Sequence, residues 1–281
     1  EAYQLLGQVY TSLGAVEQIV SGESGGERPA QVRYLQAVIA FREALKVDPE
    51  SRGSLLGLMQ LYHQRGRLDL AKDTLEKWLA LEDENPSGSD DQYEETVTQL
   101  YLQKREYEDQ LEQSDKQLEE TLKKQSEAIA QAEAAKAAES GKSPGAAPGE
   151  ARPLAEAEAE ESTQLILAAM TCNSAGRPLK ALQMLQEKND LMRANPLGSV
   201  VLGQLLIETG DLEEAHRVLS ILSQEATKQP AMFAGVDWQL NTAVSQLGIG
   251  DYTSAAETWT TQLNLTNKQA VSEQLYSSAL F

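Results

Sequence analysis

Apolar residues recur three or four positions apart along most of the chain, and Gly or Pro residues interrupt this pattern at intervals. The stretch from Pro196 to Pro230 shows the arrangement most simply, with two apolar-striped segments on either side of Gly210. A three-four spacing is typical of amphipathic helices, whereas Gly and Pro mark the places where helices end. We therefore predict two short helices here, with a hinge at Gly210 and an end at Pro230.

The same helix pair recurs at a fixed distance along the chain. Ala215 follows Ala181 by 34 residues, and Ala71 follows Ala37 by the same distance. One such unit cannot bury its apolar face alone, so the units must stack to be stable. We therefore predict an all-α array of stacked helix pairs. The spacing of 34 residues also separates Phe41 from Leu75, Gly176 from Gly210 and Pro196 from Pro230.

These residue types resemble the tetratricopeptide repeat (TPR). Residues 3–10, YQLLGQVY, follow the pattern aromatic-x2-Leu-Gly-x2-Tyr, with Tyr3 in the place of Trp. The second half of a repeat, a small residue with a large one four positions later, is present as Ala37 and Phe41. The resemblance covers about three quarters of the chain. It implies a TPR-like α-solenoid, in which antiparallel helix pairs form a right-handed superhelix.

The first repeat departs from the family spacing. Its halves are separated by SGESGGERPAQ at residues 21–31, a stretch rich in Gly, Ser and Pro that is typical of loops. Gly14 falls where the repeat is expected to turn, and the next turn glycine, Gly66, follows only 52 residues later. We predict that a loop at about 15–32 splits this repeat.

The third block lacks its turn glycine, because Arg105 stands in that place. The apolar three-four spacing continues through Ile129, which predicts one helix from about Asp91 to Ala138. A flexible linker at 140–153 and a helix restart at 154–161 follow. Two alternatives stay open for the helix: a solvated arm, or a coiled-coil hairpin that docks or self-associates. Polar residues at the seam positions of a coiled coil weaken the second alternative; they are Lys104, Ser114 and Gln125.

The chain is thus expected to have three parts. Residues 1–89 carry the N-terminal repeats, residues 90–161 the long acidic helix with its linker and helix restart, and residues 162–281 the C-terminal repeats. The last repeat contains Trp238, Gly250 and Trp259, and Asn267–Phe281 is predicted to form a terminal cap helix.

Net charge limits the possible partners. The chain carries −19, and residues 91–161 contain 18 Asp or Glu against 8 Lys or Arg, which supplies −10 of it. Such a charge repels nucleic acid and anionic lipid, so neither is an expected partner. No apolar run approaches the roughly 20 residues that span a bilayer, so direct membrane insertion of this segment is not expected.

The compartment is not determined by the sequence. A single cysteine, Cys172, excludes an intrachain disulfide and a CxxC metal site. The chain begins at Glu1 without Met or a signal peptide, and we expect it to be a segment of a longer protein. A cytoplasmic location is favoured, and the cell envelope is the alternative if a signal or anchor lies upstream.

Catalysis has no support in the sequence. His63 and His216 are the two histidines and lie in different halves of the chain, and Cys172 lies among apolar helix residues that favour an inert buried thiol. No GxGxxG, GxxxxGK[ST] or HExxH motif is present. We therefore predict a non-catalytic protein that uses no metal and no cofactor.

The resemblance implies that the first helix of each repeat lines a concave groove. Amides dominate there, and their donors and acceptors suit the backbone of an extended peptide with little negative charge. The Lys, Arg and Asn set with which chaperone-binding TPR proteins clamp a C-terminal carboxylate is missing. Alternatively, the amides only solvate the groove. The predicted groove residues are Gln4, Gln8, Thr11, Gln60, His63, Gln64, Met170, Asn173, Gln204, Ile207 and Glu208.

The sequence therefore predicts a scaffold that binds a partner protein or peptide. Two alternatives from other classes remain: a regulatory or substrate-presenting domain of a larger enzyme, and a cell-envelope assembly or secretion factor.

Overall fold

The computed structural model describes residues 1–21, 27–86, 88, 90–139, 154–228 and 239–258, and all regular structure in these ranges is helical. This confirms the all-α class. The helices are α1 (Ala2–Ser21), α2 (Glu27–Val47), α3 (Arg52–Gln64), α4 (Leu68–Glu84), α5 (Asp91–Glu139), α6 (Leu154–Ser174), α7 (Pro178–Gln186), α8 (Asn189–Ala194), α9 (Pro196–Thr209), α10 (Leu212–Lys228) and α11 (Gln239–Gly248).

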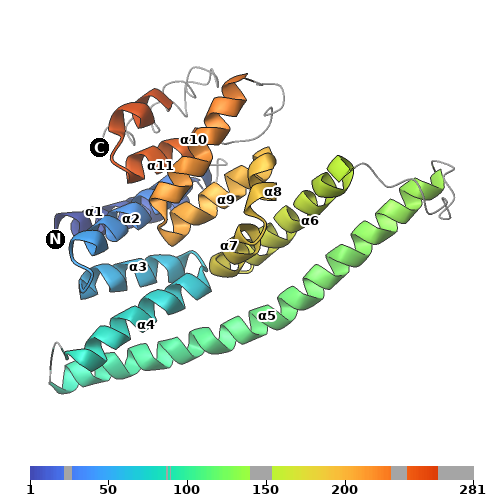
Figure 1. Ribbon diagram of the computed structural model, residues 1–281. Helices are drawn as coiled ribbons and strands as arrows, with labels where there is room; N and C mark the ends of the chain where they lie inside the picture. Colours follow the sequence, from blue (N-terminus) through green and yellow to red (C-terminus); the bar gives the residue numbers. More distant parts are fainter. Residues whose placement is uncertain (22–26, 87, 89, 140–153, 229–238, 259–281) are drawn as a thin grey trace.

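Consecutive helices pair as the repeat pattern predicts. α1 packs on α2, α3 on α4, α6 on α7 and α9 on α10, and α11 continues the stack against α10 (Figure 1). A further helix, residues 252–258, follows α11. The predicted TPR-like α-solenoid is therefore confirmed. The short helix α8 between α7 and α9 was not predicted.

Small residues bring the paired helices together. A Cβ on Gly7 would lie 2.8 Å from the ring of Phe41, and one on Gly203 would lie 2.7 Å from Leu219. Each glycine thus leaves room for the large residue of its partner helix, as the repeat pattern implies. The alanine of each second helix is fully buried in the same way; these residues are Ala37, Ala71, Ala181, Ala215 and Ala255.

The turns between paired helices are built on glycine. Gly210 has φ 91, and Gly66, Gly176 and Gly250 share this left-handed conformation, which a side chain disfavours. The predicted hinge at Gly210 is confirmed. Gly14, in contrast, is buried inside α1 and makes no turn.

The first repeat is not split by a long loop. α1 continues to Ser21 and α2 begins at Glu27, so the predicted loop at about 15–32 is wrong. The residues after Gly14 contain no Gly or Pro until residue 22, and nothing in them stops the helix. Most of the extra length in this repeat therefore lengthens its two helices.

α5 is one helix, which confirms the prediction for residues 91–138. Its middle does not stand out in solvent, because the apolar side of this part packs along α4 and reaches α6 (Figure 1). Leu100, Tyr107, Leu111 and Leu118 are buried in this contact. The prediction of a solvated arm is therefore wrong for residues 100–118. The seam proposed for a coiled coil is occupied by the repeat array of the same chain.

The polar seam residues of α5 each hold the helix on the array. Lys104 Nζ lies 3.1 Å from Glu76 of α4, and the Ser114 hydroxyl donates to the carbonyl oxygen of Ala175 at 3.1 Å. The Gln125 amide bonds the Thr171 hydroxyl of α6 at 2.9 Å. All three residues therefore bond polar groups of the array, on α4, on α6 and in the turn after α6.

The two ends of the array meet. α9 and α11 pack on α2, and α4 packs on α7, so the C-terminal helices fold back over the N-terminal ones (Figure 1). One continuous core runs from Tyr10 to Ala255. α6 begins at Leu154, so the predicted boundary at 161/162 falls inside a helix. Trp238, Trp259 and the predicted cap helix 267–281 lie outside the described residues.

Candidate functional site

A buried ion pair joins the two halves of the array where their turns meet. Nε of Arg67, in the turn between α3 and α4, lies 3.1 Å from Oε2 of Glu208 near the end of α9. Glu208 is fully buried, and Gln204 Nε2 also donates to it at 3.3 Å. Burial raises the pKa of the Glu208 carboxyl above its ordinary value, and the charge of Arg67 opposes that rise.

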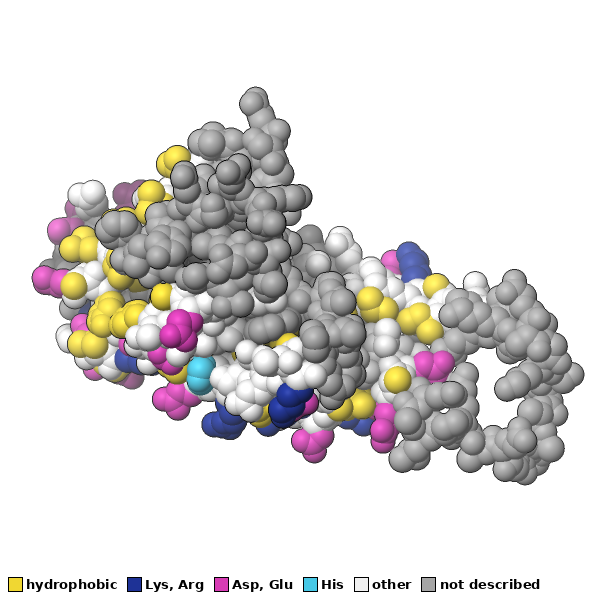
Figure 2. Space-filling view, turned by 90° about the horizontal axis from the view of Figure 1, so that it is seen from above, with side chains coloured by type: hydrophobic (Ala, Val, Ile, Leu, Met, Phe, Trp, Pro, Cys, Tyr) yellow, Lys and Arg dark blue, Asp and Glu magenta, His cyan; other side chains and the backbone are white. Residues whose placement is uncertain are grey.

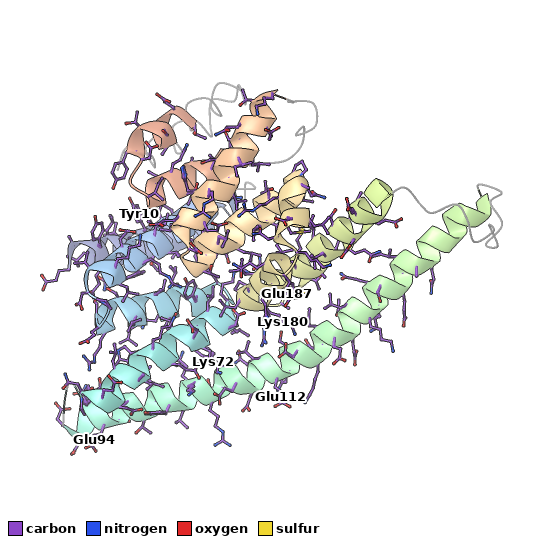
Figure 3. The ribbon with its side chains drawn as sticks, viewed as in Figure 1. Tyr10, Lys72, Glu94, Glu112, Lys180 and Glu187 are labelled. Atoms are coloured by element: carbon purple, nitrogen blue, oxygen red, sulfur yellow. The ribbon has the colours of Figure 1, made fainter. Side chains whose placement is uncertain are left out.

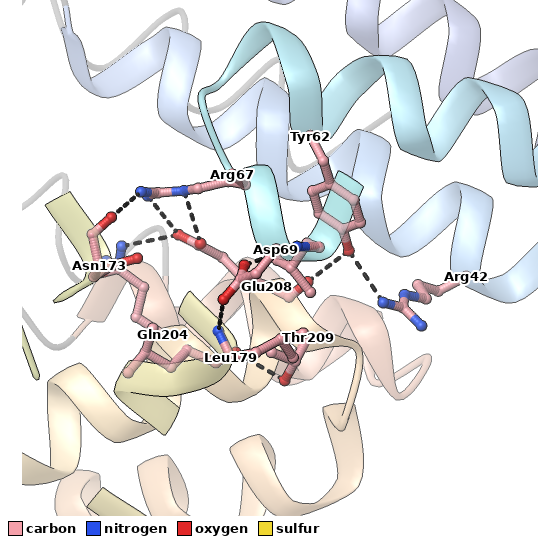
Figure 4. Close-up of polar contacts among 11 residues, drawn as sticks. Arg42, Tyr62, Arg67, Asp69, Asn173, Leu179, Gln204, Glu208 and Thr209 are labelled. Atoms are coloured by element: carbon pink, nitrogen blue, oxygen red, sulfur yellow. Dashed lines mark hydrogen bonds and ion pairs between the residues drawn. The ribbon is translucent and has the colours of Figure 1, made fainter. Parts of the chain in front are cut away.

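Tyr62 continues this polar network toward α2 (Figure 4). Its hydroxyl donates to the carbonyl oxygen of Glu208 at 2.7 Å, and Nη2 of Arg42 donates to the same hydroxyl at 3.2 Å. Burial raises the pKa of Tyr62, so the phenol stays protonated as a donor. Arg67 Nη1 also donates to the carbonyl oxygen of Asn173 at 2.8 Å.

Asp69 forms a second junction, between α4 and α7. Its Oδ2 accepts from the backbone N–H of Leu179 at 2.9 Å, and its Oδ1 accepts from that of Leu70 at 2.7 Å (Figure 4). Burial raises the pKa of Asp69 to about 6, although these N–H groups stabilise the carboxylate. The polar atoms of both junctions bond neighbouring helices and turns. We therefore assign the two junctions a role in holding the fold together rather than in binding a ligand.

Four predicted groove residues belong to this junction. Ile207 and Glu208 are fully buried, so their assignment to an open groove is wrong. Gln204 bonds Glu208, and the carbonyl of Asn173 bonds Arg67. The cause is the fold-back of α9 onto the N-terminal half, which no local pattern reports. One signal was present, since α9 is apolar on all sides and such a helix is typically buried.

The other predicted groove residues are spread over three helices. Gln60, His63 and Gln64 of α3 and Met170 of α6 are exposed, and so is Gln8 of α1. The Thr11 hydroxyl donates to the carbonyl oxygen of Gly7 at 2.8 Å, within its own helix. Gln4 is half-buried and lies against Gly53 of α3.

A shallow cleft of about 370 Å³ lies where α5 passes the end of α6. We call it the amide cleft, because three glutamines of α5 line it together with hydroxyl groups. Leu68 and Leu118 supply apolar surface. His63 of α3 lies near this part of α5, since its ring centroid is 5.5 Å from that of Tyr107, one helical turn before Gln110. The remaining lining residues are Gln110, Gln113, Ser114, Gln117, Thr121, Thr171 and Ala175.

The glutamines of this cleft are available to a ligand. Gln110, Gln113 and Gln117 are exposed, and their side-chain amides bond no other residue in the described part of the chain. Sequence reasoning missed them because they belong to the block that lost its repeat turn. Their spacing of three and four residues, which places them on one side of a helix, was a usable signal.

The opposite flank of α5 is charged. Lys72 of α4 and Lys180 of α7 lie on the side of the array that faces α5 (Figure 3). Lys72 Nζ is 3.6 Å from Glu108, and Lys180 Nζ is 2.9 Å from Asp115. The ion pairs therefore lie on one flank of α5 and the free amides on the other.

Neither catalytic nor metal chemistry emerges from the described residues. Cys172 is buried, and burial raises the pKa of its thiol, so the reactive thiolate is disfavoured. His216 bonds Ser220 within one helix at 3.2 Å. Across the described ranges, no group of His, Cys, Asp and Glu is placed to hold a metal ion. Among the helices described, none combines the length and the apolar character needed to cross a bilayer.

Comparison with known proteins supports the repeat assignment. A family model described as tetratricopeptide repeat matches residues 173–236. No curated protein matches the chain. Repeats of this family are in general non-catalytic and support protein–protein contacts. A general role in protein–protein interaction is therefore indicated for this chain.

Two solved structures are similar to this chain over most of its length. One is from a functional characterisation of Pseudomonas aeruginosa PilF, with 14% identity, 99% of each chain covered and a TM-score of 0.38. The other is the TPR2AB domain of yeast Sti1 in complex with pHSP90, with 16% identity, 96% of this chain and 98% of that chain covered, and a TM-score of 0.36. At these values neither structure informs the function of this chain. The family match, together with the helix pair α9–α10 and its glycine turn at Gly210, identifies residues 173–236 as tetratricopeptide repeat.

Proposed function

We propose that this protein is a non-catalytic scaffold that binds an extended peptide of a partner protein in the amide cleft. The observation that supports it is the lining of that cleft, where Gln110, Gln113 and Gln117 present unbonded amides beside two leucines. Buried polar groups are normally hydrogen-bonded within the protein. Exposed amides that bond no other side chain can instead bond a ligand.

The chemistry of the cleft suits a peptide backbone. Each glutamine offers two donors and an acceptor, so three of them can pair with successive N–H and C=O groups of an extended chain. Leu68 and Leu118 offer apolar contact for one peptide side chain. Exposed Gln64 and His63 extend the polar surface toward α3.

Charge selects among peptides. None of the described residues that line the cleft is charged, and the chain as a whole carries −19. Acidic peptides are therefore repelled at long range, and neutral or basic ones are preferred. The basic residues close to α5 do not change this, because Lys72 and Lys104 are paired with glutamates.

The test is fluorescence anisotropy with a panel of labelled basic, neutral and acidic ten-residue peptides. We expect Gln110→Ala/Gln117→Ala to weaken binding of the best peptide about tenfold, from the loss of two hydrogen bonds. Gln99→Ala, which removes an exposed glutamine of α5 outside the cleft, is the matched control. A preference for acidic peptides, or equal binding by both variants, would contradict the proposal.

The sequence-level alternatives, a regulatory segment of a larger enzyme and a cell-envelope assembly factor, remain predictions. No feature of the described residues favours either over the scaffold.

A further inference from the structure

One side of α1 is apolar and faces solvent. Leu5, Val9, Leu13 and Val16 recur at helical spacing and are 61%, 53%, 40% and 57% exposed. At 3.6 residues per turn they form a continuous stripe. A surface helix normally turns such a stripe toward the core, yet the core side of α1 is formed by other residues, among them Gly7 and Gly14. We call these four residues the α1 stripe.

A cavity lies on another side of the same helix, where Tyr3, Leu6 and Tyr10 line it instead of the stripe residues. About 640 Å³ lies between α1 and α2 on one side and the end of α11 with the turn after it on the other. Hydrophobic side chains gather at this N-terminal side of the molecule, seen from above in Figure 2, and Figure 3 shows Tyr10 on α1 where it faces the C-terminal helices. The main apolar walls are Tyr3, Leu6, Tyr10, Ile39, Ile249 and Tyr252.

The rim of this cavity is acidic. Glu43 and Glu213 line it. Among the described residues that line it, Lys46 is the one cation, and it lies 2.6 Å from Glu43, which neutralises it. Glu213 is exposed, and the described residues provide it with no ion-pair partner. Asp251 adds a further carboxylate beside the lining residue Gly250. An apolar surface with an acidic edge is therefore open to a ligand.

The negative charge of the molecule limits which ligand can cover the α1 stripe and the cavity. A second copy of the chain would bring the same acidic rim and another −19 to the contact, and an anionic membrane would be repelled likewise. A stripe along a helix also fits a helix better than a strand, because its ridges follow the spacing of three and four residues. From Leu5 to Val16 the stripe is about 17 Å long, or three turns of a partner helix.

We propose that the α1 stripe and its cavity dock an amphipathic helix of a partner protein, whose apolar stripe is flanked by Lys or Arg. The apolar side chains of that helix cover the α1 stripe and enter the tyrosine-lined cavity. Its basic side chains meet Glu43, Glu213 and Asp251 at the rim. This surface is separate from the amide cleft, so the two proposals stand independently.

The test uses the full chain and two synthetic helical peptides of 18 residues that share one leucine stripe. One peptide carries Lys on both flanks of the stripe and the other carries Glu. At physiological salt we expect the Lys peptide to bind at least tenfold more tightly. The variant Val9→Gln/Leu13→Gln should bind the Lys peptide at least tenfold more weakly than the wild type does. Leu102→Gln, on the exposed side of α5 and 52% exposed in the wild type, is the matched control.

Three results would overturn the proposal. The first is equal or tighter binding of the Glu peptide. The second is binding of the Lys peptide that is unaffected by Val9→Gln/Leu13→Gln, which would mean general attraction to an acidic protein. The third is a concentration-dependent dimer, seen by light scattering, that the double variant dissolves, which would assign the stripe to self-association. Circular dichroism checks that each variant is folded.

Discussion

Arg67 and Glu208 are 141 residues apart in sequence, and their side chains form an ion pair with Nε and Oε2 separated by 3.1 Å. The pair lies where the turn of the second repeat meets the end of α9. It therefore ties the N-terminal half of the array to the C-terminal half. Because Glu208 is fully buried, its charge depends on this partner.

Removing one member of this pair should destabilise the protein strongly. Arg67→Met leaves a buried carboxylate without its cation, and we expect the free energy of unfolding to fall by about 3–5 kcal/mol. The double variant Arg67→Met/Glu208→Leu should recover most of that loss, because two apolar side chains need no partner. Urea unfolding of four proteins measures it: the wild type, Arg67→Met, Glu208→Leu and the double variant. If the double variant loses the sum of the two single losses, the two residues are not coupled.

Asp69 predicts a pH dependence of stability. Its pKa rises from 3.8 to about 6 on folding, so the folded state holds this proton more tightly than the unfolded state does. Its contribution is therefore fully present below about pH 4 and is lost as the pH rises to about 6. The loss is up to about 3 kcal/mol.

Asp69→Asn removes this titration. The stability of the variant relative to the wild type should therefore increase between pH 4 and pH 7, when both are unfolded in urea at each pH. Taking the difference cancels every other titrating group. A difference that stays constant over this range would show that Asp69 does not titrate there.

Two turn glycines should differ although both have positive φ. Gly66→Ala places a Cβ in open space and meets only the backbone strain, about 1–2 kcal/mol. A Cβ on Gly176 would lie 2.3 Å from the carbonyl oxygen of Gly66, so the two turns must separate. We expect Gly176→Ala to cost about 1–3 kcal/mol more. Thermal unfolding of the pair measures this, and equal losses would contradict the turn-to-turn contact.

The middle of α5 should loosen when Asp115 is replaced. Asp115 Oδ2 lies 3.0 Å from Arg177 and Oδ1 lies 2.9 Å from Lys180, so one carboxylate joins α5 to the start of α7. We expect Asp115→Ala to speed hydrogen exchange in residues 112–125, while exchange in α3 and α4 stays unchanged. Glu112→Ala is the control, because within the described residues Glu112 pairs with Lys116 of its own helix and with no other helix. Equal exchange in the two variants would show that the ion pairs do not hold the helix.

Local signals were sufficient for the repeats. Gly210 and Ala215 act within one helix pair, so their spacing reports the turn and the close packing directly. The same logic failed at Gly14, because a glycine makes a turn only where the helix can end, and Gly14 is packed inside α1. Local patterns thus predicted most of the helices, but they misplaced the loop at 15–32 and the boundary at 161/162 and missed α8.

Residue roles in the site were harder to predict. Glu208 lies at a register position that faces a groove in an open superhelix, but here α9 folds back onto α2 and buries it. Ser114 and Gln125 were interpreted as faults in a coiled-coil seam, and both bond polar groups of α6 or of the turn after it. In each case the deciding partner is far away in sequence.

The sequence by itself determined the helices, their pairing and most of the glycine turns, because these depend on contacts within about 34 residues. Only the tertiary structure decided that the array folds back on itself, that α5 lies along it, and which polar residues stay free. The physical reason is that the burial of a side chain and its hydrogen bonds depend on which neighbouring segment packs against it. For Arg67 and Glu208 that neighbour comes from the other half of the chain.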